Sequence, residues 1–393
     1  LVEETPEAAS APAESEAPTG PSEVPAPTQS APPGQSGGWV EADQWRPEFE
    51  SSEHPSITIS NDVIQLAFSP VGAGIRKAEL TQYNTQNNGG GPLIMDQWPI
   101  LPFSLSTSNR DVFEVIKADT TGITMQSGAD PDRAYSIRKE FVLREDYILE
   151  ATITFTNDGT APVLIDAFDM HVGVAHHTGP EDKQYGGMLG FDYYNGKSVD
   201  YLKLKQKKGV LEPPFETRQD SVVWAGVKNK YFTVILSPGL QIGAQADDLQ
   251  PSGIFTRLLD QSEIERTGEG VAGSIRYPAE TLAPGETATI TLYSYVGPKN
   301  YRVLNKLPNH EGLIMQFGLF GWLSKRLIDT LTFFHKLTLS WGLAIVLLTI
   351  LVKGIFWPFT HKATLSMRQM QDLQPKINAL KEKYKTDQKR LQQ

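Results

Sequence analysis

The chain of 393 residues has room for two or three domains, and its net charge of −10 is spread unevenly. Residues 362–393 carry eight Lys and Arg against three Asp and Glu, so the acidic excess belongs to the residues before them. That acidic balance argues against nucleic acid as a partner of the large N-terminal part. The absence of cysteine fits an exported domain built without disulfides.

The N-terminal residues have the composition of a tether. Residues 1–38 contain eight prolines and six glutamates but no basic or aromatic residue. Such a segment cannot bury enough apolar surface to offset the entropy lost on ordering, so residues 1–55 are predicted to be disordered. Because the chain starts at Leu1 and shows no signal sequence, we expect an export signal or membrane helix upstream. The helical pattern at Gln393 has no stop signal, so we interpret the chain as a fragment.

Apolar residues recur with a period of two from about residue 56, which is the pattern of half-buried β-strands. Clusters of Gly, Pro and Asn separate these runs, and no long helical pattern interrupts them. Residues 56–298 are therefore predicted to form one large all-β antiparallel sandwich, followed by a short, polar linker over residues 299–312. One of the clearest runs consists of Tyr135, Ile137, Lys139, Phe141 and Leu143.

Residues 313–336 change to helical spacing, with apolar and charged residues largely on opposite faces. An amphipathic helix just outside a membrane span is expected to lie in the interface plane. The alternative is a helix packed on the sandwich, but a tryptophan and the paired Lys325 and Arg326 suit a headgroup layer better. The predicted membrane-contacting residues are Phe320, Trp322, Leu323, Leu327, Leu331 and Phe334.

Residues 337–361 are predicted to span the membrane, because they contain an apolar run of about 20 residues that matches a hydrocarbon layer of roughly 30 Å. Lys353 interrupts this run. A lysine at the centre of a spanning helix costs roughly 2.5–3.5 kcal/mol on insertion scales, so it is a functional candidate. Alternatively, its alkyl stem snorkels to the cytoplasmic headgroups. Thr349, one turn earlier on the same face, favours a polar stripe that faces a wet cavity.

The basic residues after the span place the C-terminus in the cytoplasm and residues 1–336 outside it, by the positive-inside rule. Apolar residues in this segment alternate at three and four spacing, which predicts a helix whose seam needs a partner helix. An antiparallel mate beyond Gln393 is the expected partner. Pro375 either opens a new helix or kinks a continuous one. The seam consists of Met370, Leu373, Ile377, Leu380 and Tyr384.

One motif in the sandwich imitates a phosphate-binding loop. Gly196-Lys197-Ser198 resembles the end of such a loop, but the preceding Gly190 has the wrong spacing and no helix follows. A nucleotide site is therefore not predicted.

A group of histidines suggests a second chemistry. His171, His176 and His177 could hold a metal or act as acid and base, although no acidic partner with ligand spacing stands out. Histidines at a strand end are more often simple polar loop residues. Four lysines between residues 203 and 208 form a basic patch that a solvated hairpin explains.

Three stretches together resemble one protein family. They are residues 341–360 with their internal cation, residues 365–384 and residues 318–322. With residues 141–147 and 224–232 of the sandwich, they resemble the YidC family of membrane protein insertases of Gram-negative bacteria.

The resemblance implies a periplasmic supersandwich similar to sugar mutarotases, then an α-helical membrane region, then a cytoplasmic helical hairpin whose truncated first arm is residues 362–393. It also implies that the first transmembrane helix and the remainder of the hairpin lie outside this chain. Lys353 matches the position of a conserved cation, arginine in many members, and Thr349 matches the threonine one turn earlier. In the family this cation faces a hydrophilic groove open to the cytoplasm and to lipid.

The function that the resemblance implies is insertion and folding of integral membrane proteins at the bacterial inner membrane. A wet groove with a positive charge lowers the cost of moving a hydrophilic segment into the bilayer and attracts acidic residues of the passenger. Expected partners are nascent membrane proteins and the lipid bilayer, with a Sec translocon, a ribosome and a targeting receptor left open, and no specific nucleic-acid sequence. No cofactor, metal or enzymatic activity is expected.

Two other classes of function compete with this one. A membrane-anchored periplasmic carbohydrate-binding or carbohydrate-processing protein explains the sandwich and the histidines, but neither the cytoplasmic seam nor Lys353. A single-pass receptor or scaffold explains the topology, but predicts no strong dependence on the intramembrane lysine.

Overall fold

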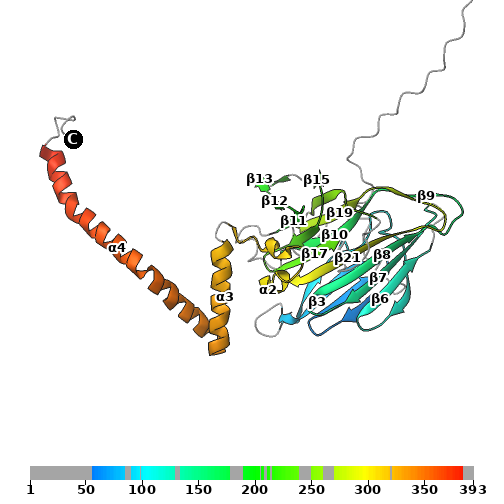
Figure 1. Ribbon diagram of the computed structural model, residues 1–393, viewed down its shortest axis with the longest axis horizontal. Coiled ribbons are helices and arrows are strands. Elements are labelled where there is room, and N and C mark those ends of the chain that lie inside the picture. The colour runs from blue at the N-terminus through cyan, green and yellow to red at the C-terminus, as the bar shows by residue number, and fades with distance from the viewer. Residues whose placement is uncertain are drawn as a thin grey trace, which may run out of the picture.

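The computed structural model describes residues 55–84, 90–97, 99–128, 133–177, 189–203, 205–207, 210–212, 215–238, 249–259, 270–318 and 321–383. The predicted tether of residues 1–55 therefore lies outside the described residues, except for Pro55. Figure 1 shows a β-rich body at one end of the molecule and two helices that extend away from it.

The body is built from antiparallel strands between residues 57 and 298. Its strands are β1 (Ile57–Ser60), β2 (Ile64–Ser69), β3 (Gly74–Asn84), β4 (Pro92–Asp96), β5 (Glu114–Ala118), β6 (Gly122–Ser127), β7 (Ser136–Leu143), β8 (Ile148–Thr156), β9 (Val163–Ile165), β10 (Phe168–His176), β11 (Gly190–Tyr194), β12 (Val199–Lys203), β13 (Lys205–Lys207), β14 (Val210–Glu212), β15 (Phe215–Gln219), β16 (Trp224–Lys228), β17 (Phe232–Pro238), β18 (Gly253–Leu259), β19 (Gly270–Tyr277), β20 (Glu280–Leu282) and β21 (Thr287–Pro298).

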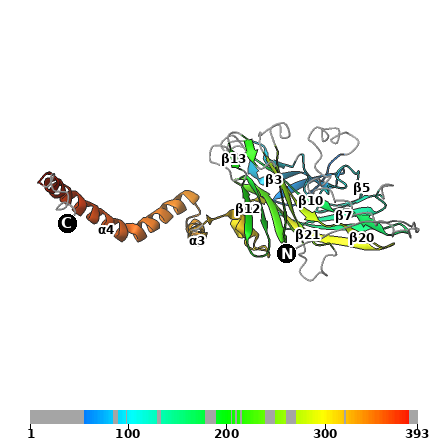
Figure 2. The same cartoon turned by 90° about the horizontal axis from the view of Figure 1, so that it is seen from above.

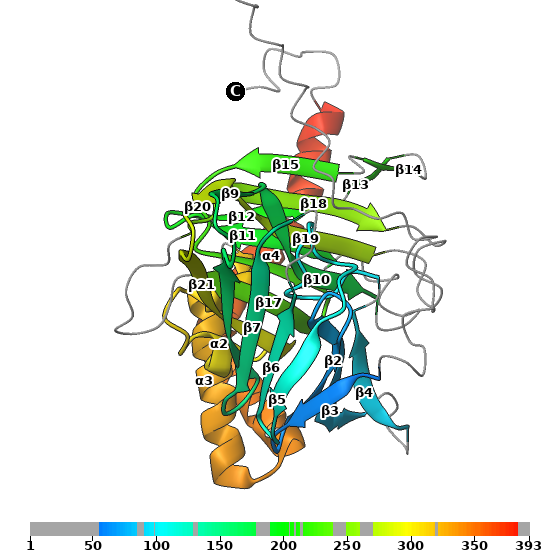
Figure 3. The same ribbon diagram turned by 90° about the vertical axis from the view of Figure 1, so that its right-hand side faces the viewer.

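The strands form one large sheet and several smaller ones. A nine-stranded sheet has the order β12-β11-β16-β17-β21-β8-β7-β6-β5, and two four-stranded sheets have the orders β10-β19-β18-β15 and β1-β2-β3-β4. The pairs β13-β14 and β20-β9 complete the described strands. In Figure 3, β2, β3 and β4 lie at one end of the body and β15 and β18 at the other.

Burial along the strands follows from the alternation of side chains between the two faces of a sheet. In β8, buried apolar residues alternate with half-buried ones along the whole strand. By contrast, β17 lies inside the nine-stranded sheet and is buried at every position. The sheets pack closely: a Cβ added to Gly273 of β19 would lie 2.1 Å from the ring of Phe191 on β11. The prediction of an antiparallel β-sandwich followed by a helical region is confirmed.

One lysine lies inside this core. Lys139 on β7 is fully buried, and its ammonium group donates to the carbonyls of Gly72 at 2.8 Å and Phe103 at 2.7 Å. The ammonium also lies 5.0 Å from the centroid of the Phe113 ring. Burial lowers the pKa of Lys139 to about 7, with the charge of Asp111 acting in the opposite direction.

The helical part contains α2 (Tyr301–Leu304), the 3₁₀ turn η3 (Glu311–Met315), α3 (Gly321–Thr338) and α4 (Trp341–Lys383). The amphipathic helix expected over residues 313–336 therefore begins only at Gly321. The backbone explains the difference, because Gln316 and Gly318 have φ values of 50° and 65°, which a right-handed helix cannot contain.

The predicted membrane and cytoplasmic helices form one element. α4 runs for 43 residues and contains both Pro358 and Pro375, so Pro375 lies within a continuous helix and does not open a new one. Figure 2 shows α4 bent near its middle, and a proline inside a helix is a common cause of such a bend because it removes a backbone donor.

Candidate functional site

The two long helices meet at a tight corner. Leu339 has a φ of 53°, which reverses the chain, and the Ser340 carbonyl accepts the first helical hydrogen bond of α4 at 3.0 Å. The rings of His335 and Trp341 stack across the corner with centroids 3.8 Å apart. Figure 1 shows the result: α3 lies across the long axis of the molecule, and α4 leads away from the body.

α4 is the candidate membrane span of the described residues. Its most apolar window has a mean hydropathy of 2.0, and only 6% of that window is buried. At 1.5 Å per residue its 43 residues extend about 64 Å, roughly twice the thickness of a hydrocarbon layer. α4 is therefore long enough to cross a bilayer and continue well beyond it.

Lys353 and Thr349 occupy one side of this helix. They are four residues apart, so their side chains lie on the same face, and both are exposed. The Thr349 hydroxyl donates to the Ile345 carbonyl at 2.8 Å, which satisfies its proton and leaves its oxygen able to accept. Large exposed apolar side chains surround them, including Ile350 and Trp357. Between Trp341 and Phe359, Thr349 and Lys353 are thus the hydroxyl and the cation that interrupt an apolar surface.

α3 carries two apolar stripes. Of the predicted interface residues, Trp322 is 70% exposed and Leu323 is also exposed, whereas Phe320 lies outside the described residues. The other three, Leu327, Leu331 and Phe334, are half-buried.

The most exposed apolar stripe on α3 was not predicted. Phe333 and Leu337 are 63% and 70% exposed, and they follow Trp322 by 11 and 15 residues, about three and four helical turns. The sequence contains this stripe, but the half-buried face has more leucines and dominates the pattern. The exposed stripe and the half-buried face are distinguished only by the packing at the α3–α4 corner, where Thr332 and Ala344 are buried.

The predicted cytoplasmic seam lies on the last turns of α4. Met370, Leu373 and Ile377 are exposed and share one face of the helix. Leu380 also belongs to α4, but its side chain lies outside the described residues, as does the whole of Tyr384.

The prediction of a short, polar linker over residues 299–312 needs correction, because these residues do not form a free spacer. Residues 299–318, here called the junction segment, are packed against the sandwich. Leu304, Glu311 and Ile314 are completely buried. A Cβ on Gly226 of β16 would lie 2.9 Å from the Cδ1 of Ile314, so the segment packs tightly against the backbone of this strand.

A buried carboxylate holds the junction segment in place. The Glu311 carboxylate accepts hydrogen bonds from the hydroxyls of Tyr293 and Ser237 and, at 3.0 Å, from the backbone N–H of Asn309. Trp224 in turn donates its indole N–H to the Asn309 carbonyl at 2.9 Å. Burial raises the pKa of Glu311, and its hydrogen bonds oppose that rise.

A second polar contact lies further along the segment. Gln316 donates its amide to the Asp192 carboxylate at 3.0 Å, and Asp192 forms a buried ion pair with Lys228. Burial raises the pKa of Asp192 despite this cation. Two polar anchors therefore tie the last residues before α3 to the nine-stranded sheet. The sequence offered one signal for this docking, namely apolar residues such as Leu304 and Ile314 inside a stretch interpreted as polar.

The motif that resembles a phosphate-binding loop and the buried histidine of the sandwich both have structural roles. Gly196-Lys197-Ser198 is the turn of the β11–β12 hairpin, and the Asn195 side chain accepts from the N–H groups of Lys197 and Ser198. His171 is buried and pairs with Ser274 at 2.8 Å. Within the described residues, no group of three or more His, Asp or Glu side chains could hold a metal ion.

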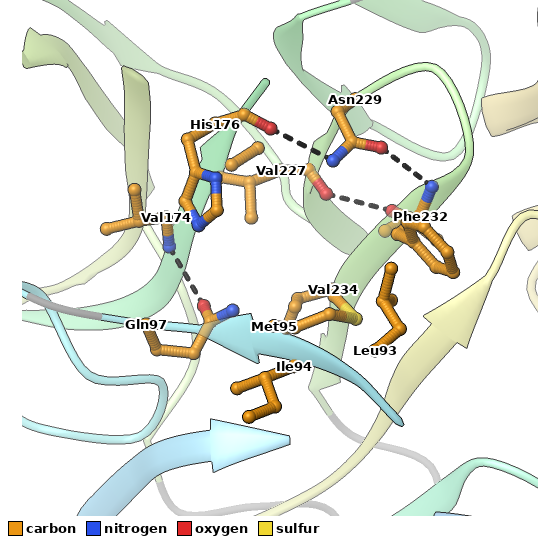
Figure 4. A pocket seen from close by; sticks show the side chains of 12 residues that line it. Leu93, Ile94, Met95, Gln97, Val174, His176, Val227, Asn229, Phe232 and Val234 are labelled. Carbon is orange, nitrogen blue, oxygen red and sulfur yellow. Dashed lines mark hydrogen bonds between the residues drawn. The ribbon is translucent and has the colours of Figure 1, made fainter. Parts of the chain in front are cut away.

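A small cavity lies beside His176, between β4, β10, β16 and β17 (Figure 4). Its volume is about 30 Å³, which fits a water molecule rather than a sugar. Both ring nitrogens of His176 lie 3.2 Å from backbone carbonyls, those of His177 and Asp96. Asn229 closes the cavity with bonds to the carbonyl of His176 and the N–H of Phe232.

An antiparallel sandwich, joined through the junction segment and α3 to an apolar helix of membrane-spanning length, is the architecture of a membrane-anchored protein with a large folded extramembrane body. Comparison with known families identifies which one. Residues 56–330 match the family described as the YidC periplasmic domain, and residues 333–393 match the family described as the 60Kd inner membrane protein. The chain belongs to the YidC family, as its resemblance indicated, and it is an inner membrane protein with a periplasmic β-sandwich.

Curated relatives named membrane protein insertase YidC match over most of the chain. The protein of Pelobacter propionicus is 25% identical over 86% of this chain and 61% of its own length. That of Tolumonas auensis is 24% identical over 94% of this chain and 69% of its own length. The protein of Nitratidesulfovibrio vulgaris strain DP4 is 33% identical over 44% of this chain. The chain thus spans about three fifths of the length of the first of these relatives.

Solved structures similar to the sandwich are distant. A galactose mutarotase related enzyme from Lactobacillus acidophilus has a TM-score of 0.42 at 10% identity, covering 61% of this chain and 97% of its own. A putative aldose 1-epimerase from Escherichia coli K12 has a TM-score of 0.40 at 10% identity, covering 62% and 99%. Likenesses of this size carry no conclusion about activity.

Proposed function

We propose that the chain forms the periplasmic body and one membrane-spanning helix of a membrane protein insertase. The observation that supports the proposal most directly is the placement of Lys353 one turn after Thr349 on an apolar helix long enough to span a bilayer. The names of the curated relatives support the same activity.

Lys353 is the residue proposed to act on the passenger. A hydrophilic segment that enters the membrane loses its hydration, which is costly for polar and charged groups. A cation in a hydrated groove lowers this cost and attracts acidic side chains of the passenger, because Coulomb interactions are stronger where the dielectric constant is low. Thr349 adds a hydroxyl oxygen that keeps water in the groove. The passenger then moves sideways into lipid as its apolar residues partition outward.

The proposed partners follow from this mechanism. They are nascent membrane proteins and the lipid bilayer. A ribosome, a targeting receptor and a Sec translocon are further candidates, since the basic residues of the segment 362–393 suit acidic or RNA-bearing partners. The mechanism needs no cofactor and no covalent step, so the protein is proposed not to be an enzyme.

The carbohydrate-binding alternative has no comparable support. The cavity beside His176 has a volume of about 30 Å³, whereas sites for small molecules enclose roughly 300–1,000 Å³. Each ring nitrogen of His176 lies 3.2 Å from a backbone carbonyl, so the imidazole faces the protein's own backbone.

The test is substitution of Lys353 in the full-length protein. Lys353→Arg is expected to retain insertion, whereas Lys353→Ala and then Lys353→Glu progressively impair insertion of passengers with acidic tails. The measurement is rescue of a depleted strain together with insertion into proteoliposomes of passengers that differ only in tail charge. If Lys353 only snorkels, Lys353→Ala will insert both passengers normally, and the groove charge is then not required.

A matched control separates charge from position. Leu351→Lys in the Lys353→Ala background restores the charge at nearly the same depth but on the opposite side of α4, since two residues correspond to about 200° of helical rotation. We expect this double variant to remain impaired. Full recovery would show that the location of the charge on the helix surface is unimportant.

A further inference from the structure

A cluster of basic and aromatic side chains surrounds the point where the sandwich passes into α3. Arg302 of α2 and Lys306, in the turn just after this helix, are both exposed, whereas Leu304 between them is buried. Lys325 lies 5.5 Å from the centroid of the Tyr301 ring, which links α2 to the start of α3. We call this surface the basic collar; it consists of Lys230, Tyr231, Tyr301, Arg302, Lys306, Phe317, Lys325 and Arg326.

The collar is continuous across three elements. The turn between β16 and β17 reaches it, because the N–H of Lys299 donates to the Tyr231 carbonyl at 2.7 Å. Next to it, the rings of Tyr301 and Phe317 meet edge to face with centroids 5.2 Å apart. Lys230 lies 4.9 Å from the centroid of the Tyr231 ring, and that ring is half exposed. The sandwich therefore contributes to the same surface as α2 and α3.

The charge of the collar contrasts with that of the body. Residues 299–328 contain five Lys and Arg and a single acidic residue, Glu311, which is buried in its own hydrogen bonds. The chain as a whole has a net charge of −10. A strip of cations on an acidic protein therefore lies at the end of the body that carries α2, which in Figure 1 is the end nearest α3 and α4.

We infer that the basic collar is a binding surface for anionic phospholipid headgroups, through which the sandwich itself lies against the outer face of the membrane. Exposed cations next to half-buried aromatic rings are the composition that the headgroup layer favours. The collar is also continuous with α3 and with α4, the candidate span. The inference rests on the membrane placement of α3 and α4 in the proposed function.

Charge complementarity and position indicate anionic lipid as the ligand of the basic collar. Anionic lipid attracts Lys and Arg within a Debye length, about 8–10 Å at physiological salt, so only cations held near the membrane surface contribute. The junction segment supplies this restraint, because Glu311 and Gln316 fix it to the sandwich. An acidic protein partner would use the same charges, and the experiment separates the two by omitting every other protein.

The experiment uses the full-length protein in proteoliposomes. The 393 residues contain no cysteine, so a fluorophore can be attached at a single Tyr231→Cys. Lipids with a nitroxide near the headgroup quench the label only if it lies at the membrane surface. We expect several-fold stronger quenching in phosphatidylglycerol-rich vesicles than at a control label on Ile116→Cys. Ile116 is half exposed on β5, on the side of the body away from α3 in Figure 2.

Charge reversal tests the mechanism of binding. Arg302→Glu with Lys306→Glu, both at exposed positions, is expected to reduce quenching at position 231 to the level seen in neutral phosphatidylcholine vesicles, as is high salt. Equal quenching at positions 231 and 116 in every lipid would contradict the inference that the basic collar binds anionic headgroups.

A third label keeps this outcome separate from the proposed function. Trp322→Cys on α3 should be quenched in all vesicles, because α3 is proposed to lie in the interface. Quenching at position 322 without quenching at position 231, and with normal insertion activity, would reject the collar alone. Loss of quenching at position 322 as well would reject the membrane placement of α3.

Discussion

Lys139 shows how one residue sets a pH dependence for the sandwich. Its pKa is lowered to about 7 in the folded state by burial, whereas an unfolded lysine has a pKa of about 10.4. Between these values the unfolded state binds more protons, so stability rises with pH.

We expect the free energy of unfolding of the sandwich to increase from pH 7 to pH 9.5 by on the order of a few kcal/mol. Lys139→Met should abolish most of this increase. Lys299, whose pKa burial lowers to about 8, accounts for a smaller remainder. Urea unfolding followed by near-ultraviolet circular dichroism at several pH values measures the effect. An unchanged slope in the variant would contradict the assignment to Lys139.

The sequence predicted the position of Lys139 but not its surroundings. Its place in the period-two run from Tyr135 to Leu143 puts it on the same face as four apolar residues, and that face is buried. The groups that make burial possible are the carbonyls of Gly72 and Phe103, which lie 67 and 36 residues away in the chain. A periodic pattern carries no information about such distant acceptors.

At the scale of elements, the junction segment depends on Glu311. Glu311→Ala removes the acceptor for Tyr293, Ser237 and the N–H of Asn309, and the cost of leaving buried donors unpaired is about 1–3 kcal/mol. We expect protease cleavage near Lys306 to become faster, while the core of the sandwich keeps its protection. Glu311→Gln retains an acceptor oxygen, so its cleavage rate should lie between those of the wild type and Glu311→Ala. Identical cleavage rates in all three proteins would mean that the segment is held by its apolar contacts alone.

The cytoplasmic part of α4 gives a second prediction. Met370, Leu373 and Ile377 form an exposed apolar face that favours a partner helix. Leu373→Asp in the full-length protein should therefore increase proteolysis after residue 362 and lower insertion activity. Gln371→Asp places the same charge about 160° away around the helix and is the matched control. Equal protection in both variants would argue against a helical partner on this face.

Helices and strands were predicted well where the sequence has one dominant hydrophobic pattern. They were predicted poorly where apolar and polar residues are mixed. The strands have a single strong period, and the residues from 341 onward form a nearly unbroken apolar run; the structure contains these strands and one long helix over that run. The junction segment combines buried apolar residues with polar ones in short turns, so its average composition looked like a linker. Its docking depends on Gly226, whose missing side chain leaves room for Ile314, and a local pattern does not reveal such pairing.

At the scale of the whole molecule, the sandwich and the junction segment behave as one unit. Deleting residues 56–298 alone would expose Leu304 and Ile314 and leave Glu311 without Tyr293 and Ser237. We expect this variant to accumulate poorly. Deletion of residues 56–318 removes the segment together with its binding surface and should accumulate close to the wild-type level with insertion largely intact. The measurement is steady-state abundance in membranes alongside rescue of a depleted strain; equal abundance of the two variants would contradict the prediction.

The order of β-body, amphipathic helix and long apolar helix followed from the sequence, but the connections between them did not. A period of two, a helical period and an apolar run each identify a part of the chain. The corner at Leu339 depends on a left-handed backbone and on the His335–Trp341 stack, and neither leaves a recognisable pattern. The same holds for the collar, whose cations are far apart in the sequence and meet only because the β16–β17 turn lies beside α2.

Pro358 removes one backbone hydrogen bond inside α4, so a change in the bend of this helix is easiest at that turn. The 25 residues beyond the proline extend about 37 Å, so a change of about 10° in the bend displaces Lys383 by roughly 6 Å. The opposite arm is short and braced by the stacked rings at the corner. A thermal fluctuation too small to disturb the periplasmic body is therefore amplified into a movement as wide as a helical turn at the cytoplasmic tip.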